Sequence, residues 1–145
     1  MHLARRFFRR GFSLIELMTV LLITGLLVSV AWPSYQSHVR RSHRAEAAAA
    51  LLEAQQFMER YYAVQGRYTT ASGAAPALPV RLQAVPAQGQ PRYRLRLEGV
   101  EAGKFTLRAD PQDVLAGDAC GSLTLASTGA KGRTGQGLTV AQCWQ

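Results

Sequence analysis

The sequence contains few of the side chains from which catalytic and metal sites are usually built. Its 145 residues include only two cysteines and three histidines, which are His2, His38 and His43. Two cysteines without a pair of nearby histidines do not make a zinc site, and no Ser–His–Asp arrangement is indicated. We therefore expect a protein that is not an enzyme and that uses no cofactor.

Two further types of site are also disfavoured. Asp110, Asp113 and Asp118 are close in sequence and could suit Ca²⁺, but their spacing does not fit the twelve-residue calcium loop. Pro111 and Gly117 indicate a turn instead, so we predict ordinary turn and capping acids and no metal. The glycines of residues 129–137 are not followed by a predicted helix, which disfavours a phosphate cradle and favours a flexible loop.

Acidic residues are scarce overall, and the formal net charge is +8 from 17 basic and 9 acidic residues. The first eleven residues contain no acid and four of the arginines, which are Arg5, Arg6, Arg9 and Arg10. Without this segment, 13 basic and 9 acidic residues leave a charge of +4. Half of the excess charge belongs to what looks like a targeting segment, so the charge alone does not indicate nucleic-acid binding.

Residues 12–32 form a long apolar run with a single charge, Glu16. As a helix this run is about 31 Å long, enough to cross a hydrocarbon core of about 30 Å. The leader arginines predict a cytoplasmic N-terminus, although Arg40, Arg41 and Arg44 after the run oppose that orientation. A secretory signal cut after Ala31 is the alternative, but the run is long for a signal core and contains a carboxylate.

Glu16 is costly in an apolar environment and should find a cationic partner. If the chain were cut between Gly11 and Phe12, Phe12 would carry a free α-amine four residues before Glu16. That amine could pair with Glu16 of a neighbouring copy, which would neutralise both charges and set the axial stagger between copies.

The stretch GFSLIEL (residues 11–17), with its basic leader and apolar run, resembles the prepilin motif of type IV pilins. In that family a prepilin peptidase cuts after the glycine and methylates the new N-terminal residue, and the glutamate guides assembly into a filament. The resemblance implies a cleaved leader at 1–11, a methylated Phe12 and an assembly role for Glu16. It also implies three partners: prepilin peptidase, other pilin subunits and the inner-membrane assembly platform.

One long helix is predicted to follow, with a hydrophobic membrane or filament part at 12–33 and an amphipathic part at 34–65. Gly25 and Pro33 interrupt the first part, so that it can bend or unwind there, and the resemblance implies loosening between them in assembled pili. The second part has a 4-3-4-3 apolar stripe typical of a core-facing helix. That stripe consists of Ala47, Leu51, Ala54, Met58 and Tyr61.

Residues 66–145 are predicted to form a connecting loop followed by a small β-sheet head. Residues 66–91 are rich in Gly, Ala and Pro, which indicates a loop. Alternating patterns predict strands at 93–97, 105–109 and 123–126, with a fourth around 138–140. The fold class is therefore α+β, a long N-terminal helix packed against a small antiparallel sheet.

Cys120 and Cys143 are expected to form a disulfide, because an export-like segment and an even cysteine count indicate an oxidising compartment. Two buried unpaired thiols are the alternative. The region from Cys120 to Trp144 also resembles the C-terminal disulfide loop of type IVa pilins, particularly the shorter minor pilins.

Arg92, Arg94 and Arg96 alternate with apolar residues, so they share one strand face, and Arg108 is expected across the turn. Such a face can hold phosphates. It can equally be a solvated face that discourages edge-to-edge association, or a contact for acidic neighbours in a fibre.

These observations favour a type IVa prepilin, a minor rather than a major one, that contributes to adhesion, twitching motility or DNA uptake. Before assembly it would be a single-pass inner-membrane protein with a periplasmic head, and afterwards part of an extracellular pilus. The alternatives are a type II secretion pseudopilin, a DNA-binding receptor pilin that uses Arg92, Arg94 and Arg96, and a secreted periplasmic domain.

Overall fold

The computed structural model describes residues 12–145. The predicted leader, including Gly11, lies outside the described residues. Helix α1 spans Leu14–Gln65 and continues through Gly25 and Pro33. The chain divides into two compact units between Ser37 and His38.

The helix of the first unit is apolar and exposed. None of the residues in its most apolar stretch is buried. By length and composition this helix could cross a membrane. The Thr19 and Ser29 hydroxyls donate to the backbone carbonyls of Ile15 and Leu26, so their polar groups are satisfied within the helix. A segment of this kind is suited to an apolar environment.

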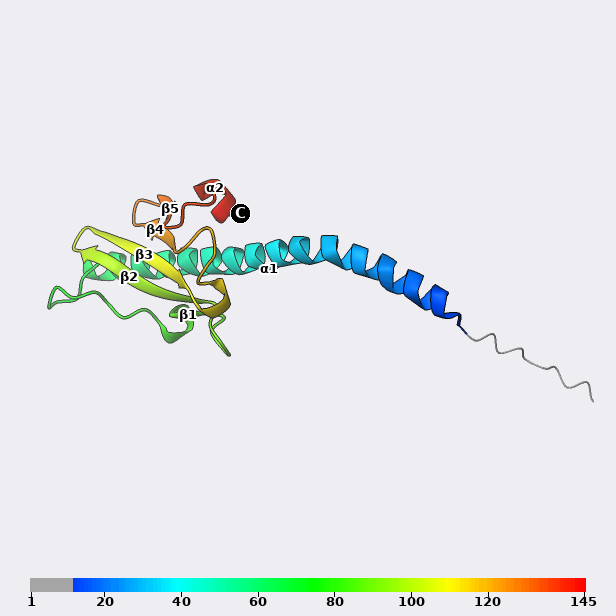
Figure 1. Cartoon of the computed structure of the whole chain (residues 1–145). Helices are drawn as coiled ribbons and strands as arrows, with labels where there is room; N and C mark the ends of the chain where they lie inside the picture. The colour runs from blue at the N-terminus through cyan, green and yellow to red at the C-terminus, as the bar shows by residue number, and fades with distance from the viewer. Residues whose placement is uncertain (1–11) are drawn as a thin grey trace, which may run out of the picture. The chain divides into compact units, whose positions relative to one another are not determined.

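The second unit contains a five-stranded antiparallel sheet in the order β1-β2-β3-β4-β5 (Figure 1). The strands are β1 Ala84–Val85, β2 Tyr93–Glu101, β3 Lys104–Pro111, β4 Leu123–Ala126 and β5 Lys131–Arg133. Two short 3₁₀ turns, η1 Val80–Leu82 and η2 Asp113–Leu115, and helix α2 Val140–Cys143 complete it. The predicted fold class and the three predicted strands that became β2, β3 and β4 are confirmed.

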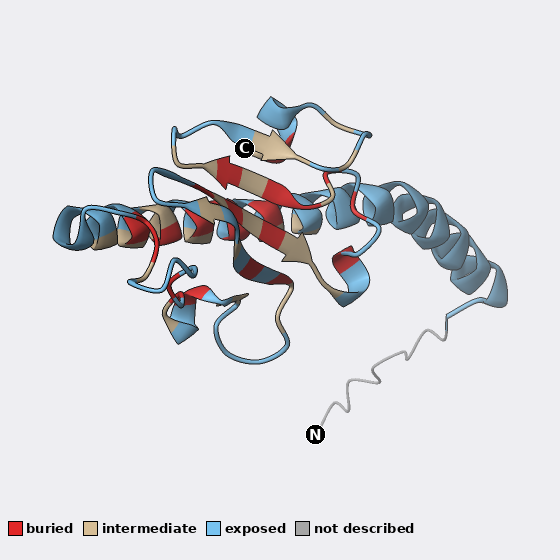
Figure 2. Ribbon diagram, turned by 90° about the vertical axis from the view of Figure 1, so that its left-hand side faces the viewer, coloured by how far each residue is buried: buried red, intermediate tan, exposed pale blue. Residues whose placement is uncertain are grey.

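The core of this unit lies between the second half of α1 and the sheet. Ala47, Leu51, Ala54 and Met58 are fully buried, and Figure 2 shows buried positions on both the helix and the strands. The inward-facing strand residues are Tyr93, Leu95, Phe105, Leu107, Leu123 and Leu125. The 4-3-4-3 stripe therefore packs as predicted, except that its last member, Tyr61, is only partly buried.

The predicted fourth strand around 138–140 is wrong. Leu138 precedes Thr139, which caps helix α2: its hydroxyl accepts from the Gln142 N–H, and the Gln142 side chain accepts from the Thr139 N–H. This reciprocal capping box favours a helix start over a strand. The strand that follows β4 is instead β5, which begins seven residues before the predicted strand. It pairs with β4, and Gly132 lies opposite Thr124.

The glycine-rich segment is packed rather than a flexible loop. A Cβ on Gly132 would lie 2.4 Å from the Thr124 Oγ1, and one on Gly135 would lie 2.3 Å from the Ala119 carbonyl oxygen. The Gly135 N–H donates to the Cys120 carbonyl at 2.9 Å. Glycine is therefore required at these positions because neighbouring chain segments approach closely.

The connecting loop is also more ordered than its composition indicates. It contains η1 and the short strand β1, which pairs with the start of β2. Tyr68 is buried and packs edge-on against Phe105, with ring centroids 4.7 Å apart. Its hydroxyl donates to Glu59 at 2.9 Å. Burial, followed by this hydrogen bond, raises the pKa of Tyr68.

Candidate assembly and phosphate-binding surfaces

Glu16 lies in the first turn of α1, surrounded by exposed apolar side chains. Its neighbours Phe12, Leu14 and Ile15 are each more than 70% exposed. Among the described residues, no ion pair to Glu16 is formed within the chain. This end of the helix therefore carries an apolar surface and a carboxylate that other molecules can contact.

Gly25 and Pro33 are both helical in this structure. Proline has no N–H, so the carbonyl of Ser29 has no helical partner. A Cβ on Gly25 would have no neighbour within 4 Å, so this glycine is not required by packing. The structure thus shows a weak point in the helix, and loosening between the two residues remains a prediction.

Cys120 and Cys143 form a disulfide whose Cα atoms are 5.8 Å apart and whose side chains are fully buried. Asp118 lies two residues before Cys120, and its carboxylate accepts a hydrogen bond from the Cys120 N–H at 2.9 Å. The same carboxylate accepts two hydrogen bonds from Arg44 of α1, at 3.0 Å from Nε and 2.8 Å from Nη2. The start of the disulfide loop is therefore fastened to the helix.

This buried ion pair corrects two sequence-based interpretations. The sequence groups Arg44 with Arg40 and Arg41 as a basic cluster after the apolar run, yet Arg44 is 8% exposed and binds Asp118 through Nε and Nη2. Asp118 is not only a capping acid. The pair joins residues 74 positions apart, and no local pattern in the sequence indicates which acid meets which base.

Tyr93 lies close to this ion pair and points inward, as its alternation with arginines predicts. Burial, reinforced by the negative charge of Asp118 and opposed by Arg44, raises its pKa to about 12. Within residues 12–145 its hydroxyl has no hydrogen-bond partner. The phenol is therefore held neutral in the core.

The outward face of the sheet is polar and rich in arginine. Arg94 and Arg96 are exposed on β2, where they alternate with the buried Tyr93 and Leu95 and the partly buried Leu97. In the register of β2 and β3, Arg96 lies opposite Arg108 and Arg94 lies opposite Asp110. Arg92 precedes β2 and is partly exposed. The alternation and the cross-strand position of Arg108 follow the sequence prediction.

Asp110 is the centre of a hydrogen-bond network on this face. Its Oδ2 accepts from the Arg96 Nε at 2.7 Å, and its Oδ1 accepts from the Arg108 Nε at 2.7 Å and the Ser122 hydroxyl at 2.6 Å. Partial burial works against ionisation, but the hydrogen bonds from Ser122, Arg96 and Arg108 outweigh it and lower the pKa of Asp110 to about 2. Asp110, predicted as a turn acid, instead organises the arginines of the strand face.

The three aspartates do not form a calcium site. Asp110 and Asp118 are committed to separate arginines, and Asp113 lies in η2. Across the described part of the chain, no group of three His, Cys, Asp or Glu side chains could hold a metal ion.

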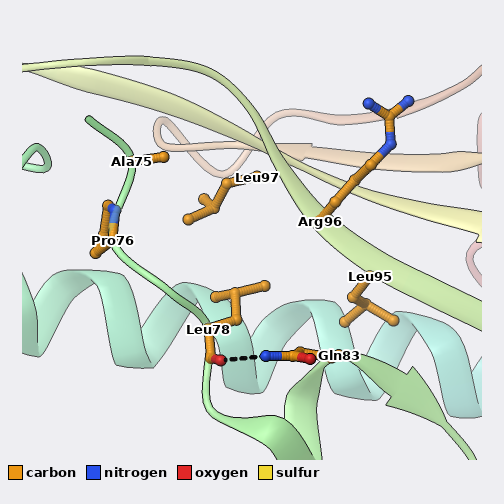
Figure 3. Close-up of a pocket in the computed structure, with 7 residues that line it drawn as sticks. All are labelled: Ala75, Pro76, Leu78, Gln83, Leu95, Arg96 and Leu97. Carbon is orange, nitrogen blue, oxygen red and sulfur yellow. Dashed lines mark hydrogen bonds between the residues drawn. The ribbon is translucent and has the colours of Figure 1, made fainter.

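An open pocket of about 260 Å³ lies beside β2 (Figure 3). Its walls are Ala75, Pro76, Leu78 and Gln83 from the loop and Leu95, Arg96 and Leu97 from β2. The Gln83 side-chain amide donates to the Leu78 carbonyl at 2.8 Å, which holds this wall in place. Figure 3 shows Leu95 pointing toward α1 and Arg96 pointing away from it. The arginine end is therefore outside the pocket, on the polar face.

Two family models match the chain. Residues 6–32 match the prokaryotic N-terminal methylation motif. Residues 33–124 match a model described as type IV minor pilin ComP, DNA uptake sequence receptor. Together they cover the apolar helix and most of the second unit, including the arginine face.

Known proteins with similar sequences are fimbrial subunits. The chain is 37% identical over 67 residues to the fimbrial protein EcpC of Eikenella corrodens, which is 46% of this chain and 44% of that protein. It is 34% identical over 77 residues to the type IV major pilin protein PilE1 of Neisseria gonorrhoeae, covering 50% and 47% of the two chains. These matches therefore span less than half the length of the curated relatives.

The fold is similar to that of a solved minor pilin. The crystal structure of the non-core minor pilin PilV of Neisseria meningitidis matches with a TM-score of 0.53 and 28% identity. The match covers 72% of this chain and 95% of that one. A long helix under a small antiparallel sheet is thus common to both.

Proposed function

Because the chain belongs to the type IV pilin family, in the class of the minor pilin ComP, we propose that it is a minor subunit of a type IV pilus. The observation that carries this proposal is the combination of a methylation motif, an exposed apolar helix and a disulfide-closed head. The family and the fold are those of structural subunits, so the proposed contribution is to assembly and surface contacts rather than to catalysis.

The proposed maturation begins with cleavage between Gly11 and Phe12 by a prepilin peptidase, which then methylates Phe12. Phe12 lies just before α1, which begins at Leu14. Before assembly the apolar helix would anchor the chain in the inner membrane, with the head in the periplasm. The assembly platform would then transfer the helix from lipid into the filament, so that little apolar burial is lost.

Glu16 is proposed to pair with the methylated Phe12 amine of a neighbouring subunit. The carboxylate is exposed in the single chain and lies among apolar side chains. In a filament core without water, an unpaired carboxylate is expensive, and pairing removes this cost. Glu16 would thereby select one axial stagger between subunits.

The pilus assignment can be tested in the native organism by shearing surface pili from cells. We expect the chain in the sheared fraction at far lower abundance than the major subunit, and we expect it to be retained in membranes when the prepilin peptidase gene is deleted. Absence from sheared pili together with presence in a secretion complex would support the pseudopilin alternative instead. The disulfide and the ComP-class match are the features that favour the pilus.

A second candidate function is that of a DNA receptor on the pilus. The matched family model is described as a DNA uptake sequence receptor, and the sheet presents Arg94 and Arg96 on an exposed face. Among adhesion, twitching motility and DNA uptake, DNA uptake is therefore the best supported process. Binding of labelled duplex DNA that weakens as salt rises would support this function, and an absence of binding at low salt would contradict it.

A further inference from the structure

Asp110 lies within the most arginine-rich part of the sheet. A surface selected only for positive charge would omit this carboxylate, because it lowers the local potential. By the register of β2 and β3, Arg94, Arg96 and Arg108 share this face with Asp110 and Glu98. The question is therefore what an acid contributes at the centre of a basic surface.

The two arginines that bind Asp110 differ in how many of their nitrogens are hydrogen-bonded. Arg108 is engaged at all three nitrogens, with Asp110 at Nε, Glu98 at Nη1 and Ser122 at Nη2. Arg96 is held by Asp110 at Nε alone. In the described part of the chain, its two terminal nitrogens therefore have no intramolecular partner.

This arrangement leaves the terminal nitrogens of Arg96, Nη1 and Nη2, available to a ligand from solvent. A guanidinium binds a phosphate through a fork of two N–H donors. Asp110 binds only the Nε of Arg96, so Nη1 and Nη2 can still form such a fork. Figure 3 shows this side chain extended away from α1. Fixing it in advance reduces the rotamer entropy that binding would otherwise cost.

Arg94 is the neighbour of Arg96 on the same face. Two positions along a strand separate the residues by about 6.7 Å. Within residues 12–145, Arg94 makes no ion pair, so its charge is available. The hydroxyls of Thr106 and Thr124 lie on the same face by register, and hydroxyl groups commonly contact phosphate oxygens.

We propose that Arg94 and Arg96 form a binding site for the backbone phosphates of double-stranded DNA, and that Asp110 is the positioning residue that holds Arg96 ready for it. This inference rests on the DNA-receptor function proposed above. It assigns the contact to backbone recognition, which orients the protein on a duplex without selecting a sequence.

The test compares Asp110→Asn with Glu98→Gln in the full chain, purified in detergent, with a labelled DNA duplex as the probe. Each variant removes one carboxylate from the same face, so local charge alone predicts tighter binding by both. Positioning predicts opposite signs: about two- to threefold tighter binding for Glu98→Gln, and about three- to tenfold weaker binding for Asp110→Asn. Equally tight or tighter binding by Asp110→Asn would overturn the positioning role.

A second variant keeps the test decisive if Asp110→Asn does not fold. Arg96→Lys retains the charge at an exposed position but loses the Nε contact and the fork. We expect it to bind DNA several-fold more weakly than the wild type, whereas a role of charge alone predicts no change. Unchanged thermal unfolding of Arg96→Lys would show that the loss does not come from the fold.

Neutralising the arginines tests the phosphate site itself. Arg94→Gln and Arg96→Gln should each lower the slope of log K against log salt by about 1. Arg81→Gln is the matched control, because Arg81 is paired with Glu53 away from this face, and its slope should not change. If the wild type binds DNA and neither Arg94→Gln nor Arg96→Gln changes that binding, the site is refuted but the receptor function is not. If the wild type does not bind DNA at about 50 mM salt, both are refuted.

Discussion

Asp110 and Asp118 are separated by one short 3₁₀ turn, yet they serve different parts of the molecule. Asp118 is buried and joins the disulfide loop to Arg44 of α1. Asp110 lies on the outer face and organises Arg96 and Arg108. Removing one partner of a buried ion pair such as Arg44–Asp118 lowers the free energy of unfolding by about 3–5 kcal/mol. At the scale of single residues, one acid therefore secures the fold and the other arranges a surface.

Tyr93 should give the folded head a distinctive alkaline transition. Its pKa in the fold is about 12 because burial disfavours the phenolate, against about 10 in an unfolded chain. The pKa is raised by folding, so this contribution to stability is complete below pH ~10 and is lost as the pH rises toward about 12. Chemical unfolding measured across this window should show the decline.

Tyr93→Phe is the matched variant for that experiment. The hydroxyl has no hydrogen-bond partner among the residues described, so its removal should leave stability near neutral pH unchanged within about 1 kcal/mol. The variant should also lose most of the decline between pH ~10 and ~12. A decline of the same size in the variant would show that another group causes it.

Glu16 supports a prediction about assembly. Glu16→Ala should leave membrane insertion and leader cleavage nearly intact, because it makes the helix more apolar. It should reduce incorporation into sheared pili or methylation of Phe12, since the partner of the neighbouring amine is lost. Glu46→Ala, in the exposed face of the second unit, is the control and should assemble normally. Normal incorporation of Glu16→Ala would contradict the pairing.

At the scale of elements, the disulfide loop holds the end of the sheet. It encloses β4 and β5, and Trp144 next to it donates from its indole N–H to the Gly132 carbonyl at 3.0 Å. Lys131 lies 5.2 Å from the centre of the same ring. These contacts join the last strand to α2, so the C-terminal segment packs as one unit with the sheet.

Replacing both cysteines by serine should lower the free energy of unfolding by about 3–4 kcal/mol, the value expected for a loop of 23 residues. Denaturant unfolding of the detergent-solubilised chain, with and without reductant, measures this loss. The wild type under reductant should match the double variant under oxidising conditions. A loss below about 1 kcal/mol would show that packing of the C-terminal segment is sufficient without the bond.

The elements that sequence patterns predicted are those whose partners are implicit in the pattern. The alternation around Tyr93, Phe105 and Leu123 faces one buried layer, so β2, β3 and β4 could be placed from the sequence. The stripe on α1 could be placed in the same way. Strand β5 was missed because Lys131–Arg133 has no apolar alternation, and its pairing depends on a glycine that fits against Thr124.

The surface network was predictable only in part. Alternation correctly placed Arg94 and Arg96 on one face, with Arg108 across from them. The role of Asp110 could not be predicted, because it depends on the register between β2 and β3 and on Ser122 from another segment. The Arg44–Asp118 pair was missed for the same physical reason, since a contact across 74 residues leaves no periodic signal.

At the scale of the whole molecule, the chain combines two units with opposite requirements. The first unit exposes nearly all of its apolar side chains, which is stable only in a lipid bilayer or against other subunits. The second has its own core, a disulfide and a polar outer face. The assembly proposed above requires both properties, because the helix would change its surroundings while the head stays folded.

The central claim is that residues 1–11 are removed so that the helix begins at a methylated Phe12. Intact-mass measurement of the protein purified from membranes of its own organism tests this most directly. We predict a chain that starts at Phe12 and carries one additional methyl group, and a full-length chain when the prepilin peptidase gene is deleted. A mature chain that starts at Trp32 would contradict the account, because it would identify the apolar helix as a discarded secretion signal.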